Sequence, residues 1–492
     1  MNPIILSEID IETAKLLGHG YSTKYNALPI KREQEHLWVA MAEPGNPAYL
    51  ADLADITGMF IVPVAANAEE IRLLINKLLA TDTFTTIESK FLADAQLNRR
   101  ADIQSPEFLA EISDAPAVRL MYSIIESGVL RRASDIHIEP YGGSLRTRFR
   151  IDGVLYTYNL VDISLLSNVI SRLKIMGGMD ISEKRRPQDG RFTLLIHEEK
   201  IEFRLSTLPT TLGEKAVIRI LYNQATRLAK DELGFFPDDL QRLTSLFNRS
   251  YGAIFITGPT GSGKSTTLNS FMAELNKEGV NIVTVEDPVE NPLAGVNHVN
   301  IERAAGVTFA GALKHILRQD PDIIMIGEIR DEDTARIAIQ AATTGHVVLS
   351  TLHTNDAAGV IERLMDMRIE PYLSAAALNG VISQRLVRRV CPNCAKLTVI
   401  SARYATILGI PESVNVLEAK GCESCANTGY KGRLAVYDYI ILDESTQRNM
   451  STRPYEFAAE LRKHNTFKEN ALRHLYAGNT TPEEIVKILN MV

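Results

Sequence analysis

The chain has 492 residues, which is long enough for several domains. Its hydrophobic content of 45%, charged content of 23% and net charge of −7 are ordinary for a soluble globular protein and lack the basic excess of a general nucleic-acid binder. The sequence has no apolar run near the roughly 18–20 residues that a membrane span needs, and its N-terminus has no signal-peptide pattern. We therefore expect a cytoplasmic protein that reaches a membrane only through a partner.

Residues 1–80 are predicted to form a small N-terminal α/β docking domain, in which no chemical motif stands out. Apolar spacing indicates two helices, at residues 11–17 and 66–79, and short apolar runs indicate two strands, at residues 36–42 and 59–64. Residues 81–112 are more polar and are predicted to be a linker.

Residues 113–225 are predicted to form a second N-terminal domain of the α+β class. An amphipathic helix is expected at 117–128, ending at Gly128. Alternation of apolar and polar residues predicts a half-exposed antiparallel sheet with strands at 134–139, 145–151 and 201–206. The pair Asp152-Gly153 predicts a hairpin turn.

Arginine is concentrated on the polar faces of these strands, beside the run Lys184-Arg-Arg186. The residues are Arg146, Arg148, Arg150, Arg191 and Arg204. Alternating charge on a strand most often marks only a solvated face. In an acidic protein, such a cluster also fits a phosphate bound elsewhere in an assembly, because an arginine finger can reach a γ-phosphate from a neighbouring subunit. We expect at least one of Arg148, Arg150 and Arg191 to act in this way.

A complete G-x-x-x-x-G-K-[ST] loop occupies residues 258–265 of a third domain, which is predicted to span 234–492. The loop lies between an apolar strand at 253–256 and a helical segment, so its backbone N–H groups lie at the positive end of a helix and suit triphosphate. The alternative is a chance glycine-rich turn. We expect Lys264 to reach the β- and γ-phosphates and the Ser265 hydroxyl to ligate Mg²⁺. The predicted nucleotide-binding residues are Gly258, Pro259, Thr260, Gly261, Ser262, Gly263, Lys264, Ser265 and Thr266.

Three further apolar strands alternate with helices after this loop, which predicts a parallel sheet buried on both faces. They lie at residues 282–285, 323–326 and 347–350. Ligands bind at the carboxyl ends of such strands. Glu286, Glu328 and His353 follow these three ends, so we expect them to be catalytic together with Lys264.

Each of these three residues has a predicted role and a plainer alternative. Glu328 occupies the Walker B position and would hold the Mg²⁺ shell or orient the attacking water. Glu286 is the second candidate for activating water, and His353 is expected to contact the γ-phosphate. The alternatives are carboxylates that only cap the next helix and a histidine that is only buried.

Four cysteines form two C-x-x-C pairs within an expected zinc subdomain at residues 388–435. They are Cys391, Cys394, Cys422 and Cys425. Two such pairs predict a tetrahedral zinc site, which would be structural because four protein ligands leave no position for water. Disulfides or unconnected thiols are the alternatives, and a reducing compartment disfavours the disulfides.

Two long blocks, at residues 308–331 and 344–355, resemble the secretion ATPase superfamily of type II secretion and type IV pilus assembly ATPases. The likeness covers residues 113–492 and includes an aspartate box at 284–290. It implies a multidomain α/β protein with a RecA-like, parallel-sheet P-loop ATPase domain and a zinc subdomain. An α+β, PAS-like domain and the small docking domain would precede them.

This resemblance implies a cytoplasmic, homohexameric ATP hydrolase that uses ATP, Mg²⁺ and Zn²⁺. It would drive assembly of a type II secretion pseudopilus or a type IV pilus, and so protein secretion. The first domain would dock, through a cytoplasmic-domain partner, onto an inner-membrane platform protein, which places the chain peripherally at the inner membrane. The cysteine pairs resemble the assembly and secretion branch and disfavour retraction, and Ser265 and residues 285–288 look slightly closer to secretion.

Two other classes of function remain as alternatives. A ring ATPase that translocates nucleic acid, for DNA uptake or conjugation, would need basic or aromatic pore loops. The acidic balance and the single tryptophan disfavour it, so no nucleic-acid partner is expected. A nucleotide-binding scaffold without turnover is disfavoured by the acidic residues at the strand ends.

Overall fold

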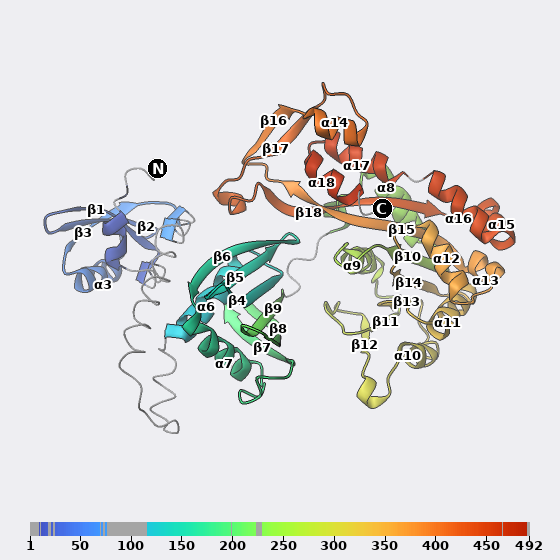
Figure 1. The fold of residues 1–492 in the computed structure, drawn as a ribbon, viewed down its shortest axis with the longest axis horizontal. Coiled ribbons are helices and arrows are strands. Elements are labelled where there is room, and N and C mark those ends of the chain that lie inside the picture. Colours follow the sequence, from blue (N-terminus) through green and yellow to red (C-terminus); the bar gives the residue numbers. More distant parts are fainter. Residues whose placement is uncertain are drawn as a thin grey trace. The chain divides into compact units, whose positions relative to one another are not determined.

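The structure is a computed structural model in which the chain divides into two units (Figure 1). Unit 1 comprises Met1–Arg150, Leu155–Thr193 and Phe203–Ile220, and unit 2 comprises Ile151–Val154, Leu194–Glu202 and Leu221–Val492. The described residues are 9, 11–17, 21–22, 25–68, 70–71, 74–75, 116–197, 199–222, 229–464 and 466–489. The linker expected at 81–112 and part of the helix expected at 66–79 lie outside them.

The first part of unit 1 is a three-stranded sheet in the order β1-β2-β3 with short helices. Its elements are α1 (Ile11–Ala14), η2 (Lys15–Leu17), β1 (Ala27–Glu33), β2 (His36–Met41), α3 (Pro47–Thr57) and β3 (Phe60–Ala65). The strands expected near 36–42 and 59–64 are confirmed, whereas β1 and α3 were not expected. Because α3 crosses between β2 and β3, these two strands pair in parallel.

The second part of unit 1 is formed by most of a six-stranded sheet in the order β6-β5-β4-β9-β8-β7. Its strands are β4 (Asp135–Tyr141), β5 (Ser144–Ile151), β6 (Val154–Asp162), β7 (Gln188–Ile196), β8 (Glu199–Thr210) and β9 (Gly213–Leu221). The three expected strands are present as β4, β5 and β8, and β4 pairs antiparallel with both β5 and β9. The turn between β5 and β6 has positive φ at both Asp152 and Gly153, as the predicted tight hairpin requires.

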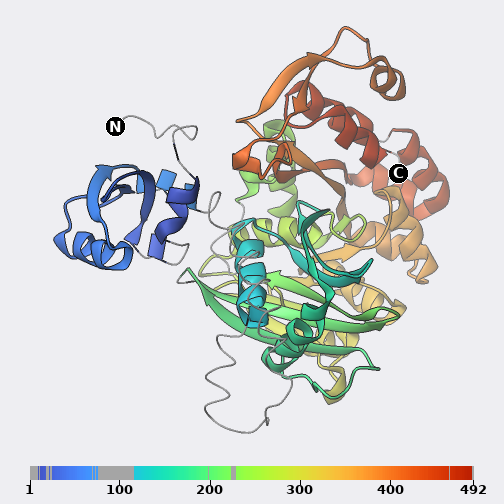
Figure 2. The ribbon, with the colours of Figure 1, turned by 60° about the vertical axis from the view of Figure 1, so that its left-hand side comes forward.

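Two helices, α6 (Pro116–Leu130) and α7 (Leu166–Met176), pack side by side against this sheet (Figure 2). The short helix η3 (Ile163–Leu165) directly precedes α7 in the chain. The expectation that the first helix ends at Gly128 is wrong, since α6 continues to Leu130. Gly128 serves close packing instead: a Cβ atom there would lie 2.6 Å from the Ile136 side chain. Strand alternation leaves the arginines on the polar face of the sheet.

Unit 2 is built on a seven-stranded sheet in the order β12-β11-β13-β14-β10-β15-β18. The strands are β10 (Gly252–Thr257), β11 (Ile282–Glu286), β12 (Asn297–Asn300), β13 (Ile323–Ile326), β14 (Val347–Leu352), β15 (Leu378–Val390) and β18 (Tyr430–Ile441). In this order, each strand from β12 across to β15 pairs in parallel with the next, and β10 and β11 are among them. The last strand, β18, pairs antiparallel with β15. The predicted buried parallel sheet is confirmed, and β12, β15 and β18 extend it beyond the expected strands.

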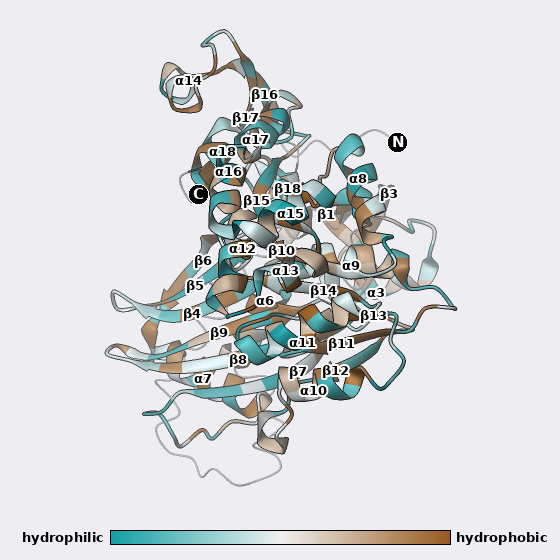
Figure 3. Cartoon of the chain, turned by 90° about the vertical axis from the view of Figure 1, so that its right-hand side faces the viewer, coloured by the Kyte–Doolittle hydropathy of each residue, from teal (hydrophilic) through white to brown (hydrophobic). Residues whose placement is uncertain are grey.

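Helices cover both faces of this sheet. Residues of α8 (Pro237–Phe247) and α9 (Lys264–Leu275) share one core with Ile254 and Ile256. Residues of α10 (Phe309–Ile316), α11 (Glu332–Thr343), α12 (Ala358–Asp366) and α13 (Pro371–Ala377) share the other with Phe255. Successive β10 residues thus enter opposite cores, and hydrophobic residues, brown in Figure 3, run along the sheet strands.

The remaining elements of unit 2 surround the cysteines and the last residues. They are η5 (Lys230–Glu232), η6 (Arg303–Ala305), β16 (Ala395–Val399), α14 (Ala402–Leu408), β17 (Asn415–Ala419), η7 (Glu423–Cys425), α15 (Glu444–Thr452), α16 (Pro454–Lys463), α17 (Phe467–Tyr476) and α18 (Pro482–Leu489). A separate core joins α14, α17 and α18 to β15 and β18. Among the described residues, no helix has the length and apolar character needed to cross a membrane.

A buried histidine on α17 makes the stability of unit 2 depend on pH. His474 is 1% exposed, and burial, helped by Arg473, lowers its pKa to about 4. Between about pH 6.5 and 4, His474 is therefore protonated in the unfolded chain and neutral in the folded chain. The free energy of unfolding thus decreases as pH falls through that window. Between about pH 7.5 and 5, we expect His474 to account for a loss of about 2 kcal/mol in the free energy of unfolding.

Denaturant unfolding of His474→Gln at both pH values measures this contribution. The variant should lose less stability than the wild type on acidification. The matched control is His464→Gln, because His464 is exposed. Equal pH dependence in His474→Gln and the wild type would contradict the assignment.

Candidate active site

The loop at residues 258–265, which we call the phosphate loop, connects β10 to α9, as predicted. Its backbone geometry requires its glycines. Gly258, Gly261 and Gly263 all have positive φ. A Cβ atom on Gly258 would lie 2.3 Å from the backbone oxygen of Gln384, and one on Gly263 would lie 2.8 Å from the Gln384 side-chain nitrogen. The loop therefore sits against β15 so closely that only glycine fits at these two positions.

Gln384 on β15 is a buried residue that holds the phosphate loop and that sequence reasoning missed. Its Nε2 donates to the Ser262 backbone oxygen at 2.7 Å, and its Oε1 accepts from the Thr267 hydroxyl at 2.9 Å. One side chain thereby joins the loop to the first turns of α9. The available signal was the polar run Ser383-Gln-Arg385 between the apolar pairs Val381-Ile382 and Leu386-Val387.

Lys264 points back into the phosphate loop. Its Nζ donates to the backbone oxygens of Gly258 at 2.9 Å and Pro259 at 3.1 Å. Burial lowers the pKa of Lys264, and the charge of Glu328 partly opposes this effect. Ser265 and Thr266, by contrast, are exposed on the first turn of α9. An ammonium beside the backbone N–H groups of the loop and an exposed hydroxyl form a donor set that fits a magnesium triphosphate.

Glu328 and His353 are brought together at the carboxyl edge of the sheet. Glu328 Oε2 lies 3.3 Å from His353 Nε2, and Glu328 Oε1 lies 2.6 Å from an Arg330 guanidinium nitrogen. Their strands, β13 and β14, are neighbours, and β14 adjoins the phosphate-loop strand β10. Glu328 is mostly buried while His353 is half exposed, so the imidazole can meet a ligand while it contacts the carboxylate.

Glu286 lies one strand farther from the phosphate loop and has a histidine partner that was not predicted. Its Oε1 accepts from the Thr284 hydroxyl at 2.7 Å and lies 3.0 Å from His298 Nδ1. His298 Nε2 accepts from the Leu293 N–H at 2.8 Å, so the neutral ring carries its proton on Nδ1, which faces both the Thr284 hydroxyl at 2.8 Å and Glu286 at 3.0 Å. His298 lies on β12, which sequence reasoning did not identify as a strand.

The predicted arginines divide into paired and exposed groups on the polar face of the sheet in unit 1. Arg148 Nε lies 2.7 Å from Glu139, and Arg150 Nε lies 3.7 Å from Asp135. Arg191 is exposed and has no ion pair among the described residues. Of the three candidates, Arg191 is therefore the one most available to an external anion.

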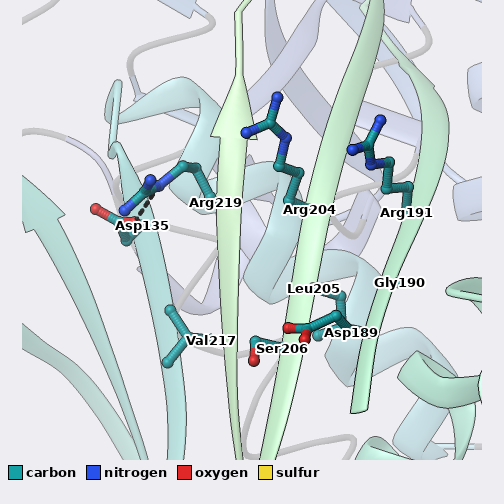
Figure 4. Close-up of a pocket in the computed structure, with 9 residues that line it drawn as sticks. All are labelled: Asp135, Asp189, Gly190, Arg191, Arg204, Leu205, Ser206, Val217 and Arg219. Atoms are coloured by element: carbon teal, nitrogen blue, oxygen red, sulfur yellow. Dashed lines mark hydrogen bonds and ion pairs between the residues drawn. The ribbon is translucent and has the colours of Figure 1, made fainter. Parts of the chain in front are cut away.

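Arg191 lines a pocket of about 540 Å³ on this face together with two further arginines, Arg204 and Arg219 (Figure 4). The three side chains come from the neighbouring strands β7, β8 and β9; Arg191 and Arg204 extend in the same direction, whereas Arg219 turns toward Asp135 (Figure 4). Asp135 pairs with Arg219 at 3.1 Å, and Asp189 also lines the pocket. Three guanidinium groups against two carboxylates give the pocket a positive balance that suits an anionic ligand.

The neighbouring row of charges is consistent with this positive balance. Burial lowers the pKa of His137, and the nearby cations Lys215, Arg150 and Arg148 lower it further. Burial alone would raise the pKa of Glu139, but Lys215, Arg146 and Arg148 outweigh burial and the pKa is lowered. The imidazole thus stays neutral and the carboxylate stays charged within a field dominated by cations.

The four cysteines form the cluster that the two C-x-x-C pairs predict. All four sulfur atoms lie within 4.8 Å of one another, with Sγ···Sγ distances of 3.9 Å for Cys391–Cys422 and 3.8 Å for Cys394–Cys425. A tetrahedron with zinc–sulfur bonds of about 2.3 Å has edges of about 3.8 Å, so the spacing fits zinc and is far too long for disulfides. Backbone N–H groups of Cys422 and Gly429 also donate to Cys425 Sγ, which suits a thiolate.

Metal analysis of the purified chain should find about one zinc per chain. We expect Cys422→Ser to lose this zinc and to unfold the region around β16 and β17, because structural zinc contributes on the order of 10 kcal/mol to folding in small modules. The exposed Ser424 lies in the same turn, and Ser424→Ala is the matched control. A zinc-free wild-type protein with normal stability would contradict the assignment.

Comparisons with known proteins identify the family of this chain. The sequence matches the family described as "Type II/IV secretion system protein" over residues 110–487 and the "MshEN domain" over residues 4–84. It is 40% identical to the type IV pilus assembly ATPase PilB of Myxococcus xanthus, covering 98% of this chain and 88% of the relative. It is 42% identical to a putative type II secretion system protein E of Escherichia coli, covering 78% of each chain.

A solved structure shares the fold. The ATPase DotB of Legionella pneumophila matches 76% of this chain and 96% of its own, with a TM-score of 0.57 and 20% identity. The chain therefore belongs to the type II/IV secretion system protein family, which is a family of ATPases.

Proposed function

We propose that this chain hydrolyses Mg-ATP and that its turnover drives assembly of a type II secretion pseudopilus or a type IV pilus, and so protein secretion. The observation that carries the proposal is the convergence of Lys264, Glu328 and His353 at one sheet edge in a chain of this family. The relatives that support it carry the names of both machines, so either machine fits. None of the relatives reported above is named for nucleic-acid translocation, and that alternative is not favoured.

The residues divide the work of phosphoryl transfer in this proposal. Lys264 would exchange the loop carbonyls for phosphate oxygens, and Ser265 would ligate Mg²⁺, which neutralises charge on the β- and γ-phosphates. Glu328 would orient the attacking water or the Mg²⁺ shell. His353, which contacts Glu328, would sense whether a γ-phosphate is present.

Glu286 has a second role in this scheme. It lies beyond Glu328 in the strand order, and its Oε1 is already held by Thr284 and His298. Glu328 is therefore our first candidate for the water-orienting carboxylate. Glu286 would line the side of the site farther from the phosphate loop and would hydrogen-bond to water molecules in the outer coordination shell of the Mg²⁺.

The arginine pocket of unit 1 would complete the site of a neighbouring subunit. A homohexameric ring would bring the exposed Arg191 to a γ-phosphate bound next door, where a guanidinium stabilises charge in the transition state. Residues 4–84, which match the MshEN domain, would dock through a cytoplasmic partner onto an inner-membrane platform protein. The chain would thus work in the cytoplasm, peripherally at the inner membrane, with zinc keeping a structural role.

Replacing Glu328 by Gln separates binding from hydrolysis. We expect Glu328→Gln to bind ATP like the wild type and to release phosphate about a hundredfold more slowly, because the amide cannot orient water as the carboxylate does. Phosphate release from Mg-ATP and the affinity for a fluorescent ATP analogue measure the two effects. The exposed Glu302 supplies the control Glu302→Gln, which should behave as the wild type.

In cells that lack the chain, the wild type should restore surface pili or protein secretion and Glu328→Gln should restore neither. Wild-type turnover in Glu328→Gln would remove this residue from the mechanism. Stimulation of the wild-type rate by DNA at physiological salt would instead favour the nucleic-acid translocating ring.

Mixing two inactive variants tests whether the site is shared between subunits. Lys264→Ala and Arg191→Ala should each be nearly inactive, since one loses nucleotide binding and the other loses the arginine finger. Co-expressed at equal amounts, they should regain about a quarter of the wild-type rate, because about one site in four combines an intact Lys264 with an intact neighbouring Arg191. The matched control is Arg185→Ala, because Arg185 is 92% exposed on the same domain. A mixture as inactive as its parts would contradict a site shared through Arg191.

A further inference from the structure

Strand β15 contributes two neighbouring polar residues, Gln384 and Arg385, to a buried part of unit 2. They are 1% and 2% exposed. Side chains alternate along a strand, so the two point to opposite faces of the sheet. Gln384 points to the phosphate loop and α9, where it bonds Ser262 and Thr267.

Arg385 points to the segment that carries His353, residues 353–356, which we call the histidine loop. Its Nη2 donates to the Asn355 backbone oxygen at 2.7 Å. Its Nη1 donates to the backbone oxygen of Gln384 at 3.2 Å, the same oxygen against which Gly258 packs. One guanidinium therefore links the histidine loop to the contact between β15 and the phosphate loop.

The histidine loop is restrained on every side except at His353. Thr354 N–H donates to the Thr257 hydroxyl at 2.9 Å, at the end of the phosphate-loop strand. The Asp356 carboxylate accepts from the Gly359 N–H, which begins α12, and from Arg462 Nε at 3.0 Å. His353 alone remains half exposed, 3.3 Å from Glu328. Its position is thus set by the anchors behind it, among which Arg385 makes the shorter of the two side-chain hydrogen bonds to the Asn355 carbonyl, at 2.7 Å against 3.4 Å from the Ser383 hydroxyl.

Packing alone does not explain a guanidinium at position 385. Burying a charged group is costly, and an apolar side chain of similar size fills a core at no such cost. The Arg385 Nε finds no hydrogen-bond acceptor, so the site does not even satisfy the whole group. Of its two hydrogen bonds, one goes to the Asn355 carbonyl of the histidine loop and the other goes to the Gln384 carbonyl of β15, against which Gly258 of the phosphate loop packs.

We infer that Arg385 is a positioning residue for ATP hydrolysis, which sets His353 relative to the phosphate loop by holding the Asn355 carbonyl, and that Gln384 holds the phosphate loop to the same strand. This inference rests on the proposed function. A shift of the phosphate loop on binding nucleotide is passed through Gln384 and Arg385 to the histidine loop.

The test separates catalysis from binding and folding. We expect Arg385→Gln to lower kcat about tenfold while the KM for ATP, the ADP affinity and the thermal midpoint stay near the wild type. Arg385→Lys keeps the positive charge and an N–H donor group, and it should recover part of the rate. The matched control is Arg389→Gln, because Arg389 is exposed on the same strand. Parallel losses of kcat, ADP affinity and thermal stability would show a merely structural role and overturn the inference.

A double-mutant cycle tests the route through His353. If Arg385 acts by placing His353, then Arg385→Gln combined with His353→Ala should be no slower than His353→Ala alone. Additive losses would overturn the inference. If the wild type releases no phosphate, the proposed function fails, and the inference is then judged by affinity. In that case, the affinity for a non-hydrolysable ATP analogue is divided by the affinity for ADP, and this ratio should lie closer to one in Arg385→Gln than in the wild type. An unchanged ratio would refute the inference.

Discussion

The candidate site depends on one constraint: four buried parallel strands of unit 2 end at the same edge of the sheet. In the order β11-β13-β14-β10, these ends carry Glu286, Glu328, His353 and the phosphate loop. The strands are largely apolar because helices cover both faces, so the first carboxylates and imidazoles occur where each strand leaves the core. Chemistry collects at this edge because only there can carboxylates and imidazoles reach water and a ligand.

Much of this arrangement was predictable because each strand is a short apolar run with its functional residue directly after it. Glu328 follows Ile323–Ile326, and His353 follows Val347–Leu352, so the sequence predicted that both lie at the carboxyl edge of the sheet. That β13 and β14 are neighbours, which brings the two side chains together, was not predicted. The cysteine cluster was predictable for a similar reason, since two C-x-x-C turns leave few ways to arrange four thiols. In both cases the information is local in sequence.

The parts that were missed depend on contacts between distant segments. β15 joins the sheet beside β10 only after more than a hundred residues, and its Gln384 supports a loop that precedes it in the chain. His298 was missed because β12 is short and half exposed, with no apolar run to mark it. Gly128 was misread as a helix end because a glycine that removes a clash with Ile136 looks the same in sequence as one that stops a helix.

β15 also explains how the candidate site and the cysteine cluster are related within unit 2. The strand carries Gln384 and Arg385 in its middle, ends at Val390, and leads directly into Cys391. Just before that end, Arg388 forms a buried ion pair with Glu484 of α18 at 2.8 Å. The far end of β15 is thus fixed by a helix and a cysteine cluster while its middle supports both loops of the nucleotide site. A strand that is fixed at its end has little freedom to slide. A displacement of the phosphate loop is therefore transmitted to the histidine loop, since β15 cannot shift along its axis to absorb it.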